Sequence, residues 1–490
     1  MISLCMIVKN EERHLEQCLN SVKNCVDEII IVDTGSTDRT IEIAKKFDAK
    51  IFEYKWNNDF SAARNFGLEK ATNELILYLD ADEKLTSDSQ KKLNDLKKRV
   101  LTKAYNCKII NINHHTNRPS VMNYPRIFPN LNSIRFEGKI HEQIIFSLNK
   151  NHIEIQQSDI EIIHSGYDLS EDDLKKKALR NLDILQEDFA VNQSSYNAFQ
   201  IAQTYNILEN EEEAEKYFLI CLKDKNLPSD YKSTALRVLS HYSLKKLDIQ
   251  KAFEYISEAI MQKPNSVINI MQQAKLFAAA KLNKNCFEAI DSAFNLSKNN
   301  HHNSHTHLQE ILISQTEVLE EGIKYALQIG EREKYEEYIS LYKQLNQNGF
   351  INTLRELEKD KIFVEQLSFD NITERQIEII VLLLNQRQDF QETIYDKLEK
   401  IHPNNYTIWK NYGLILFKQQ KYNQAEEKFR QAEKLNPHDF SLEFFIISIM
   451  IMQGKKHEAK MKLNLLERQY SFNQAIQNQI KAIYKRLEEN

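Results

Sequence analysis

Residues 28–38 read EIIIVDTGSTD, an apolar run rich in β-branched residues that ends at an acid and is followed by turn-forming residues. A short apolar run of this kind is typical of a strand buried on both faces of a sheet. Ser36 or Thr37 is placed to cap a helix that begins behind the turn. The stretch therefore predicts a strand, a tight turn and a helix, the repeating unit of an α/β domain.

The same alternation of patterns extends on both sides of this stretch, through about residue 170. Short β-branched runs alternate with amphipathic segments whose apolar residues follow a 3.6-residue period. Strands are expected at residues 2–8, 28–32, 50–53 and 75–79, and helices at residues 11–22, 37–47 and 61–71. After Asn106 the strand pattern becomes irregular, and residues 126–142 are expected to be rich in loops.

The composition of the 490 residues excludes several classes of protein. Lys and Arg number 65 against 70 Asp and Glu, and this balance argues against nucleic acid as a general partner. The six cysteines are scattered without a CxxC pair, which indicates a reducing, cytoplasmic location. The longest apolar run, 444–452, is too short to span a membrane. Residues 1–8 are expected to form a strand rather than a signal peptide.

A second architecture begins near Leu169, where the strand pattern gives way to long helical periodicity. One segment fits the tetratricopeptide repeat, a helical hairpin of about 34 residues. Its signature positions are Trp409, Tyr412, Gly413, Leu416, Ala425, Phe429, Ala432 and Pro437. Further copies are expected near residues 201–221, 239–264 and 459–466. We divide the chain into an α/β domain at 1–170, repeats at 171–300, diverged helical repeats at 301–400 and C-terminal repeats at 401–490.

Two acidic residues follow the predicted strand at 75–79, in the sequence YLDADE at 78–83. Ligands bind at the carboxyl ends of parallel strands, and carboxylates suit a Mg²⁺ or Mn²⁺ ion that itself holds a diphosphate. Asp80 and Asp82 are therefore candidates for the donor site of a nucleotide-sugar enzyme. The alternative is a solvated turn in front of the helix predicted at 87–98.

Asp33 ends the strand of the opening stretch and is placed to accept a hydrogen bond from a base such as uracil. Ser36 and Asp38 could instead serve only to begin the helix. The junction after the first strand, VKNEE at 8–12, has no glycine, so the GxGxxG pattern of nicotinamide enzymes is missing. No GxxxxGK[ST] segment occurs in the chain, which excludes the P-loop kinases and ATPases.

Four motifs in a fixed order resemble those of a known family. They are NEE at 10–12, VDTGSTD at 32–38, NDFSAARN at 58–65 and DADE at 80–83. Together they resemble the catalytic domain of glycosyltransferase family 2, which has the GT-A fold. The resemblance covers residues 1–170 and implies a UDP-sugar donor, a divalent metal and inversion at the anomeric carbon. The expected fold is an α/β GT-A nucleotide-sugar-binding domain followed by an all-α tetratricopeptide-repeat solenoid.

The resemblance also implies roles for individual residues. Glu11 and Asp33 would hold uridine, Arg64 would lie near the base or the diphosphate, and Asp80 and Asp82 would face the ribose and the metal. The full set implied for the nucleotide-sugar is Val8, Asn10, Glu11, Asp33, Ser36, Arg64, Asp80 and Ala81. His164 could join Asp82 as a metal ligand, because Gly166 and Tyr167 after it also match the family.

Inverting transfer requires a base that takes the proton of the acceptor. The segment FEGKIHE at 136–142 offers Glu142 first, with His141 and Glu137 behind it. The Glu-Asp pair frequent in the family is missing, so the resemblance leaves the choice among the three open. His141 and His164 also have a structural interpretation, as hydrogen-bonded residues without a catalytic role.

The combination of this domain with repeats resembles the sublancin-type peptide S-glycosyltransferases, which attach a sugar, typically glucose, to a cysteine of a bacteriocin. It implies UDP-glucose or another UDP-hexose as donor and a peptide or protein acceptor, modified on Cys or on Ser/Thr, in the concave groove of the repeats. Two rivals remain: a saccharide or cell-envelope glycosyltransferase whose repeats dock or dimerise it, and a non-catalytic scaffold. The run at 444–452 is expected to be a buried repeat helix, and it could also close a homodimer.

Overall fold

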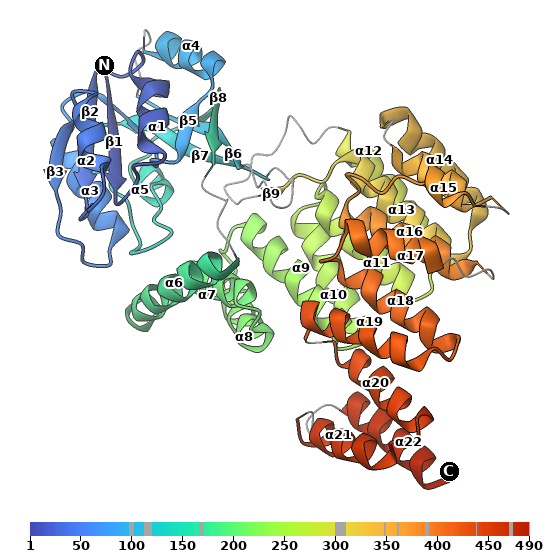
Figure 1. Ribbon diagram of the computed structural model, residues 1–490. Helices are drawn as coiled ribbons and strands as arrows, with labels where there is room; N and C mark the ends of the chain where they lie inside the picture. Colours follow the sequence, from blue (N-terminus) through green and yellow to red (C-terminus); the bar gives the residue numbers. More distant parts are fainter. Residues whose placement is uncertain are drawn as a thin grey trace. The chain divides into compact units, whose positions relative to one another are not determined.

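The computed structural model describes residues 1–97, 102–111, 120–165, 171–298, 310–346, 349–359, 362–387, 392–437, 439–469 and 474–489. The chain divides into two compact units, Met1–Gln315 and Thr316–Asn490 (Figure 1). The first unit contains the whole sheet together with the first helical repeats, and the second is helical. The predicted order of an α/β domain followed by helical repeats is confirmed.

The described part of the first unit contains one nine-stranded sheet with the order β3-β2-β1-β4-β7-β6-β8-β5, and β9 pairs with β7. Its strands are β1 Ile2–Val8, β2 Glu28–Asp33, β3 Lys50–Glu53, β4 Leu75–Tyr78, β5 Glu83–Leu85, β6 Ala104–Asn111, β7 Ser120–Pro129, β8 Ile155–His164 and β9 Glu310–Ile311. The pairs β1-β2, β2-β3 and β1-β4 are parallel, whereas β7 runs antiparallel to β4 and β6. The first four strands lie within a residue or two of their predicted positions.

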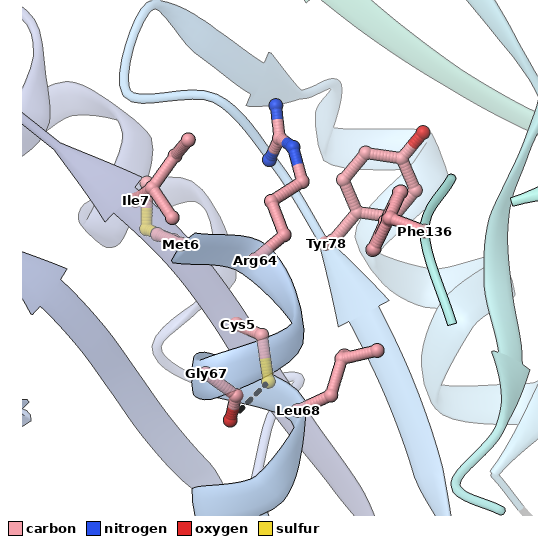
Figure 2. A pocket seen from close by; sticks show the side chains of 8 residues that line it. All are labelled: Cys5, Met6, Ile7, Arg64, Gly67, Leu68, Tyr78 and Phe136. Carbon is pink, nitrogen blue, oxygen red and sulfur yellow. Dashed lines mark hydrogen bonds between the residues drawn. The ribbon is translucent and has the colours of Figure 1, made fainter. Parts of the chain in front are cut away.

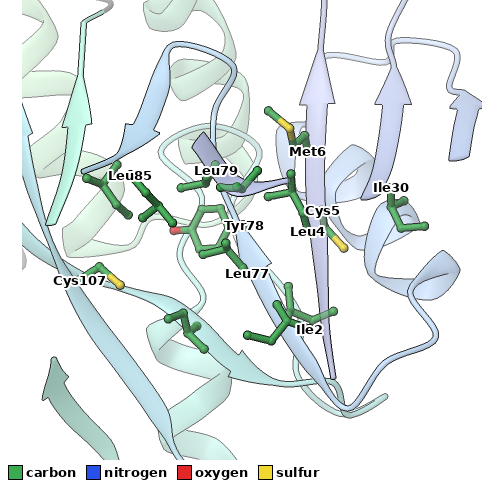
Figure 3. Packing of buried hydrophobic residues seen from close by; sticks show 14 of the residues in the cluster. Ile2, Leu4, Cys5, Met6, Ile30, Leu77, Tyr78, Leu79, Leu85 and Cys107 are labelled. Carbon is green, nitrogen blue, oxygen red and sulfur yellow. The ribbon is translucent and has the colours of Figure 1, made fainter. Parts of the chain in front are cut away.

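Five helices accompany the sheet: α1 Leu15–Val22, α2 Thr40–Lys45, α3 Phe60–Lys70, α4 Ser87–Leu96 and α5 Ile145–Lys150. Since parallel crossovers are right-handed, the strand order places α1 and α2 on one face and α3 on the other. The strand order reverses between β1 and β4, and a crevice at such a point is where α/β sheets bind ligands. Buried residues of these two strands, among them Leu4 and Leu77, form the middle of the core (Figure 3).

The first two helices begin later than predicted. Helix α1 starts at Leu15 instead of residue 11, and α2 starts at Thr40 instead of residue 37. The residue before α2 is Arg39, whose side chain caps nothing, so the prediction of Ser36 or Thr37 as N-cap is wrong. The reason is that Ser36 and Thr37 are hydrogen-bonded to Asn10 in the neighbouring loop.

The strands around and after Asn106 are longer than the irregular sequence pattern predicts. Strands β6, β7 and β8 contain eight, ten and ten residues. Register shifts at Tyr105/Asn106 and at Asn106/Lys108 interrupt the ladders, and such irregularities obscure the alternating pattern by which strands are predicted. Strand β9 was also not expected, because it consists of only two residues.

The helical part of the first unit consists of α6 Glu171–Val191, α7 Ser195–Ile207, α8 Glu211–Cys221, α9 Ser229–Lys245, α10 Ile249–Gln262, α11 Val267–Ala279 and α12 Asn283–Ser297. Consecutive helices pair as hairpins, with fully buried Ala214 and Ala252 in the second helix of two of them. Ile140 of the α/β domain packs with Leu182 of α6 and Ile201 of α7 in one apolar cluster. These helices therefore share a core with the α/β domain.

The second unit contains α13 Gln315–Ile329, α14 Arg332–Leu345, α15 Gly349–Leu357, α16 Glu374–Gln386, α17 Glu392–Ile401, α18 Tyr406–Lys418, α19 Tyr422–Leu435, α20 Phe440–Met452, α21 Lys456–Gln469, α22 Gln474–Glu489 and a 3₁₀ turn at Val364–Gln366. A Cβ on Gly413 would lie 2.7 Å from the ring of Phe429, so α18 approaches α19 closely at this glycine. In helix α20 the residues Ile446, Ile447 and Ile449 are buried, whereas Met452 is exposed, so the run 444–452 is buried on one face only.

The six cysteines are buried: Cys5, Cys18, Cys25, Cys107, Cys221 and Cys286. The first four belong to the core of the α/β domain and Cys221 to the α7–α9 cluster. In the described ranges, no helix is both long and apolar enough to traverse a bilayer.

Candidate active site

The loops after β1, β2 and β4 bring the predicted acidic residues to one edge of the sheet. Glu11 follows β1, Asp33 ends β2, and Asp80 and Asp82 follow β4. These are the strands on both sides of the reversal in strand order. The carboxylates therefore gather where ligands of α/β sheets bind.

Asp33 is buried and is held by its own turn. Its carboxylate accepts hydrogen bonds from the backbone N–H of Ser36, at 3.1 Å, and of Gly35, at 3.3 Å. Gly35 has φ +107°, a conformation that glycine adopts readily. A carboxylate oxygen has more than one acceptor site, so Asp33 keeps capacity for the N–H of a base.

The loop after β1 is fastened to the loop after β2. The N–H of Asn10, which has φ +58°, donates to Ser36 Oγ at 3.0 Å, and Asn10 Oδ1 accepts from the N–H of Thr37 at 2.8 Å. The carbonyl oxygen of Val8 accepts from the backbone and the hydroxyl of Thr34. Val8, Asn10 and Ser36, all predicted to contact the nucleotide, thus belong to one rigid rim.

Arg64 joins this edge to the predicted catalytic loop. Its Nη2 donates to Asp80 Oδ1 at 2.7 Å and its Nε to Glu142 Oε1 at 2.5 Å, and only 9% of the side chain is exposed. The guanidinium lies beside the rings of Tyr78 and Phe136, 5.2 and 5.6 Å from their centroids (Figure 2). Although burial opposes it, the charge of Arg64 holds the pKa of Asp80 below its usual range.

Asp82 and His164, the predicted metal ligands, lie together. His164 Nε2 is 3.1 Å from Asp82 Oδ2, and His164 Nδ1 is 2.7 Å from Asn111 Oδ1. Because the amide nitrogen of Asn111 donates to Ser120 Oγ, its oxygen faces the ring and favours a proton on Nδ1. Although burial opposes it, the hydrogen bond and the charge of Asp82 raise the pKa of His164, which favours a second proton, on Nε2, that is donated to Asp82. A bound metal ion would take the place of that proton. Gly166 and Tyr167 lie outside the described residues.

The pKa of Glu11 is raised to about 7. Burial is the largest cause, and the negative charges of Asp82 and Asp80 are the next. A divalent cation would relieve this repulsion, so the donor set fits the expected metal. Within the described ranges there is no cluster of three or more His, Cys, Asp or Glu ligands. The protein would thus supply Asp82 and His164, and the diphosphate and water would supply the other ligands.

Two supporting residues were not predicted. Arg126 of β7 donates to Glu83 Oε1 at 2.5 Å, and Glu83 Oε2 accepts from the N–H of Asp80 at 2.9 Å. Both side chains are almost completely buried. The pair therefore stabilises the turn that carries Asp80 and Asp82 from the buried side of the sheet edge. Glu83 belongs to the DADE motif, whereas nothing in the sequence around Arg126 indicates its partner.

The three candidate bases lie in a short hairpin but differ in position. The backbone of Glu137 pairs with Gln143 and its side chain is exposed, outside the cavity described below. Glu142 is 12% exposed and held by Arg64. His141 has φ +52°, is exposed and lines the cavity described below; the surrounding protein atoms, followed by the charge of Lys177, lower its pKa, so the ring is neutral at pH 7. The structure brings Glu142 and His141 together and separates them from Glu137.

A cavity of about 480 Å³ lies in front of Glu142 and His141. One wall belongs to the α/β domain and includes Arg64 and Arg126. The other wall comes from α6, α7 and α9 and includes Lys177, Asn181, Tyr196, Phe199, Gln200, Gln203, Tyr231 and Thr234. The helical repeats therefore form half of the space into which the candidate bases open.

Comparison with known proteins identifies two segments. Residues 3–146 match the family described as Glycosyl transferase family 2, and residues 406–439 match the Tetratricopeptide repeat. The chain is 31% identical over 221 residues to the SPbeta prophage-derived glycosyltransferase SunS of Bacillus subtilis, covering 44% of this chain and 52% of SunS. It thus spans about half the length of that relative.

Over 147 residues the chain is 40% identical to a TPR repeat-containing protein of Synechococcus elongatus, covering 30% of this chain and 36% of that one. Among solved structures, S. aureus TarS is 17% identical with a TM-score of 0.29, covering 59% of this chain and 55% of TarS. Residues 3–146 therefore match glycosyltransferase family 2, and the same chain carries a segment that matches the tetratricopeptide repeat.

Proposed function

We propose that the protein is an inverting, metal-dependent glycosyltransferase that moves a hexose, glucose in the first instance, from a UDP-sugar to a Cys, Ser or Thr side chain of a peptide or protein such as a bacteriocin precursor. The observation that carries the proposal is the position of Arg64. Its guanidinium contacts two carboxylates at once. One is Asp80, at the edge of the sheet that also carries Glu11, Asp33 and Asp82, which we call the donor edge. The other is Glu142, which lines the cavity. Donor and acceptor would meet at Arg64.

On the donor side, Asp33 and Glu11 would hold uridine, and Asp82 with His164 would hold Mg²⁺ or Mn²⁺. A bound divalent ion offsets the negative charge that develops on the departing diphosphate. The carboxylate of Asp80 is committed to Arg64, which leaves Asp82 as the metal ligand of the pair. Burial is the largest cause of the raised pKa of Glu11, and the charges of Asp82 and Asp80, which also raise it, support a cation at this place.

On the acceptor side, Glu142 and His141 would act as the base. The acceptor sulfur or oxygen forms a bond to the anomeric carbon while the bond from that carbon to the phosphate oxygen breaks, and UDP leaves with the electron pair. The acceptor proton passes to Glu142, or to the imidazole of His141, which its low pKa keeps neutral. A thiol acceptor needs less help than a hydroxyl, because its reference pKa is near 8.5.

The cavity wall formed by α6, α7 and α9 supports a polypeptide acceptor. Amide groups such as Gln200 and Gln203 can hydrogen-bond to a peptide backbone in several registers. The similarity to SunS and the tetratricopeptide repeat agree with this choice. A cytoplasmic, reducing location, which keeps an acceptor thiol free, is part of the proposal.

The test is the intact mass of Cys- and Ser-bearing peptides, including a bacteriocin-like helical hairpin, after incubation with UDP-glucose, Mg²⁺ and the full chain. A hexose increment that disappears in Asp82→Asn supports the proposal. Asp88→Asn is the matched control, since Asp88 is exposed on α4 and pairs with Lys92; it should retain the activity.

The other outcomes separate the rivals. UDP release without any mass increment on the peptide would indicate that the acceptor is a saccharide rather than a peptide. Neither UDP binding nor UDP release would contradict catalysis and favour a scaffold. Full activity in Asp82→Asn would contradict the metal assignment.

A further inference from the structure

One side chain of the helical region reaches the hairpin that carries Glu142 and His141. The hydroxyl of Tyr196, at the start of α7, donates to the carbonyl oxygen of His141 at 2.9 Å. The same hydroxyl accepts from Gln143 Nε2 at 2.8 Å. Tyr196 therefore binds the residues on both sides of Glu142.

The first half of the hairpin is held from within the α/β domain. The side-chain amide of Asn65 bonds to both the N–H and the carbonyl oxygen of Phe136, at 2.8 and 3.0 Å. Ser61 Oγ donates to the carbonyl of Gly138, and the N–H of Phe60 to that of Lys139. All three partners belong to α3, so this half needs nothing from the helical region.

The second half is held differently. His141 has φ +52°, in the left-handed region that residues with a Cβ adopt uncommonly. The side chain of Gln143 is clamped between two phenols, since Tyr124 donates to its oxygen at 3.0 Å and Tyr196 accepts from its nitrogen. Of these two phenols, Tyr124 belongs to β7 and Tyr196 to the repeat helix α7.

Tyr196 is itself fixed in place. Its ring makes edge-to-face contacts with Tyr231 and Phe146, with centroids 5.7 and 6.0 Å apart. Burial raises the pKa of Tyr196, so the group stays a neutral phenol that donates one hydrogen bond and accepts another. Tyr196 also lines the cavity in front of Glu142.

We infer that Tyr196 is a positioning residue for the transfer step: from the first helical repeat it orients the His141 carbonyl and Gln143, and through them the carboxylate of Glu142 and the imidazole of His141 toward the cavity. The inference rests on the proposed function. It assigns to the repeats a part in building the catalytic hairpin, in addition to presenting the acceptor.

Tyr196→Phe removes one oxygen atom and keeps the ring contacts. The matched control is Tyr205→Phe, since Tyr205 lies on the same helix but outside the cavity, and its hydroxyl bonds to Gln186 of α6. We expect kcat for peptide modification to fall about 10- to 100-fold in Tyr196→Phe, because a catalytic group is then misplaced, while Tyr205→Phe stays near wild type. Binding of UDP and the melting temperature should match in the two variants.

Hydrogen exchange of the full-length protein gives a readout that does not depend on the acceptor. The N–H groups of Gln143 and Ile144 bond to Glu137 and Tyr124, so they should exchange faster in Tyr196→Phe, while amides of α3 stay unchanged. Gln143→Leu should reproduce the loss of kcat, and the double variant should add little to it, because both changes break one network.

The inference is overturned if Tyr196→Phe keeps wild-type kcat, or keeps the wild-type exchange of residues 141–144. It is also overturned if the variant loses UDP binding and thermal stability in proportion to activity, because the role would then be general to the fold. If the wild type modifies no peptide, the proposed function has failed, and the exchange experiment still decides whether Tyr196 holds the hairpin.

Discussion

The two halves of the candidate active site are built in opposite ways. The donor edge is made of carboxylates on short loops after parallel strands, and hydrogen bonds from main-chain N–H groups to side-chain oxygens hold these loops. Half of the residues in the wall formed by α6, α7 and α9 are aromatic or amide residues, and Lys177 is the charged residue among those that line the cavity from these helices. The donor edge suits one charged ligand in one geometry, whereas the helical wall suits a neutral chain in many registers. The two halves meet at the contact of Arg64 with Glu142.

Replacing Arg64 should break both halves at once and give the largest effect. Arg64→Met leaves Glu142 and Asp80 without their partner, and loss of one member of a buried ion pair costs about 3–5 kcal/mol. We expect transfer to fall by more than about 1000-fold, since both charge stabilisation and the base are disturbed. Urea denaturation and peptide-modification kinetics measure the two effects. Arg39→Met, at an exposed ion pair with Glu12, is the control and should change neither.

The metal assignment on the donor edge can be tested separately from the helical wall. His164→Ala should weaken Mn²⁺ binding about 10- to 100-fold, and high Mn²⁺ should restore most of the activity. Peptide binding should not change, because His164 lies outside the cavity of the helical wall. Isothermal titration with Mn²⁺ and UDP measures the first effect. An unchanged Mn²⁺ affinity would remove His164 from the metal site.

A change on the helical wall should act on the acceptor alone. Gln203→Ala removes one amide of the cavity, and loss of one neutral hydrogen bond of about 1 kcal/mol corresponds to a roughly 5-fold higher KM for the peptide. The KM for UDP-glucose should not change. Steady-state kinetics with each substrate varied in turn separate the two constants, and an equal rise in both would contradict the division into donor edge and helical wall.

The smallest expected effect is a pH dependence of stability that comes from Glu11. Folding raises its pKa from 4.5 to about 7, so the folded state binds this proton more tightly than the unfolded state does. Its contribution to stability is therefore lost as pH rises through that window. In metal-free buffer the melting temperature of wild type relative to Glu11→Gln should fall as pH rises from 4.5 to 7. Saturating Mg²⁺ should reduce the fall, and a difference that does not vary with pH would contradict the shift.

Local patterns were enough to predict the strands and acids of the donor edge. The pattern of residues 28–38 predicted strand β2 and the position of Asp33 at its end. The DADE motif at 80–83 predicted the turn that places Asp82 beside His164. Residues that act through contacts distant in sequence were not predicted. Arg126 bonds to a residue 43 positions away and Tyr196 to one 55 positions away, and no periodicity encodes such pairs.

The helix starts and the later strands were misjudged for a related reason. Ser36 and Thr37 are residue types that often cap helices, but here both are hydrogen-bonded to Asn10 in the loop after β1. Tertiary hydrogen bonds thus overrode a local preference. The sequence favours Glu142 over Glu137 without excluding either, and the bond from Arg64 and the cavity distinguish the two in the structure.

The buried cysteines acquire a further meaning in an enzyme whose acceptor can be a thiol. Burial raises the pKa of Cys5, Cys18, Cys107 and Cys221, so these sulfurs are neither accessible nor ionised. If the acceptor is a thiol, as proposed above, the enzyme would not glycosylate its own cysteines, and these cysteines would not form mixed disulfides with the acceptor. A thiol reagent added to a reaction mixture would then count only the unmodified acceptor, and the enzyme would contribute no background to the assay.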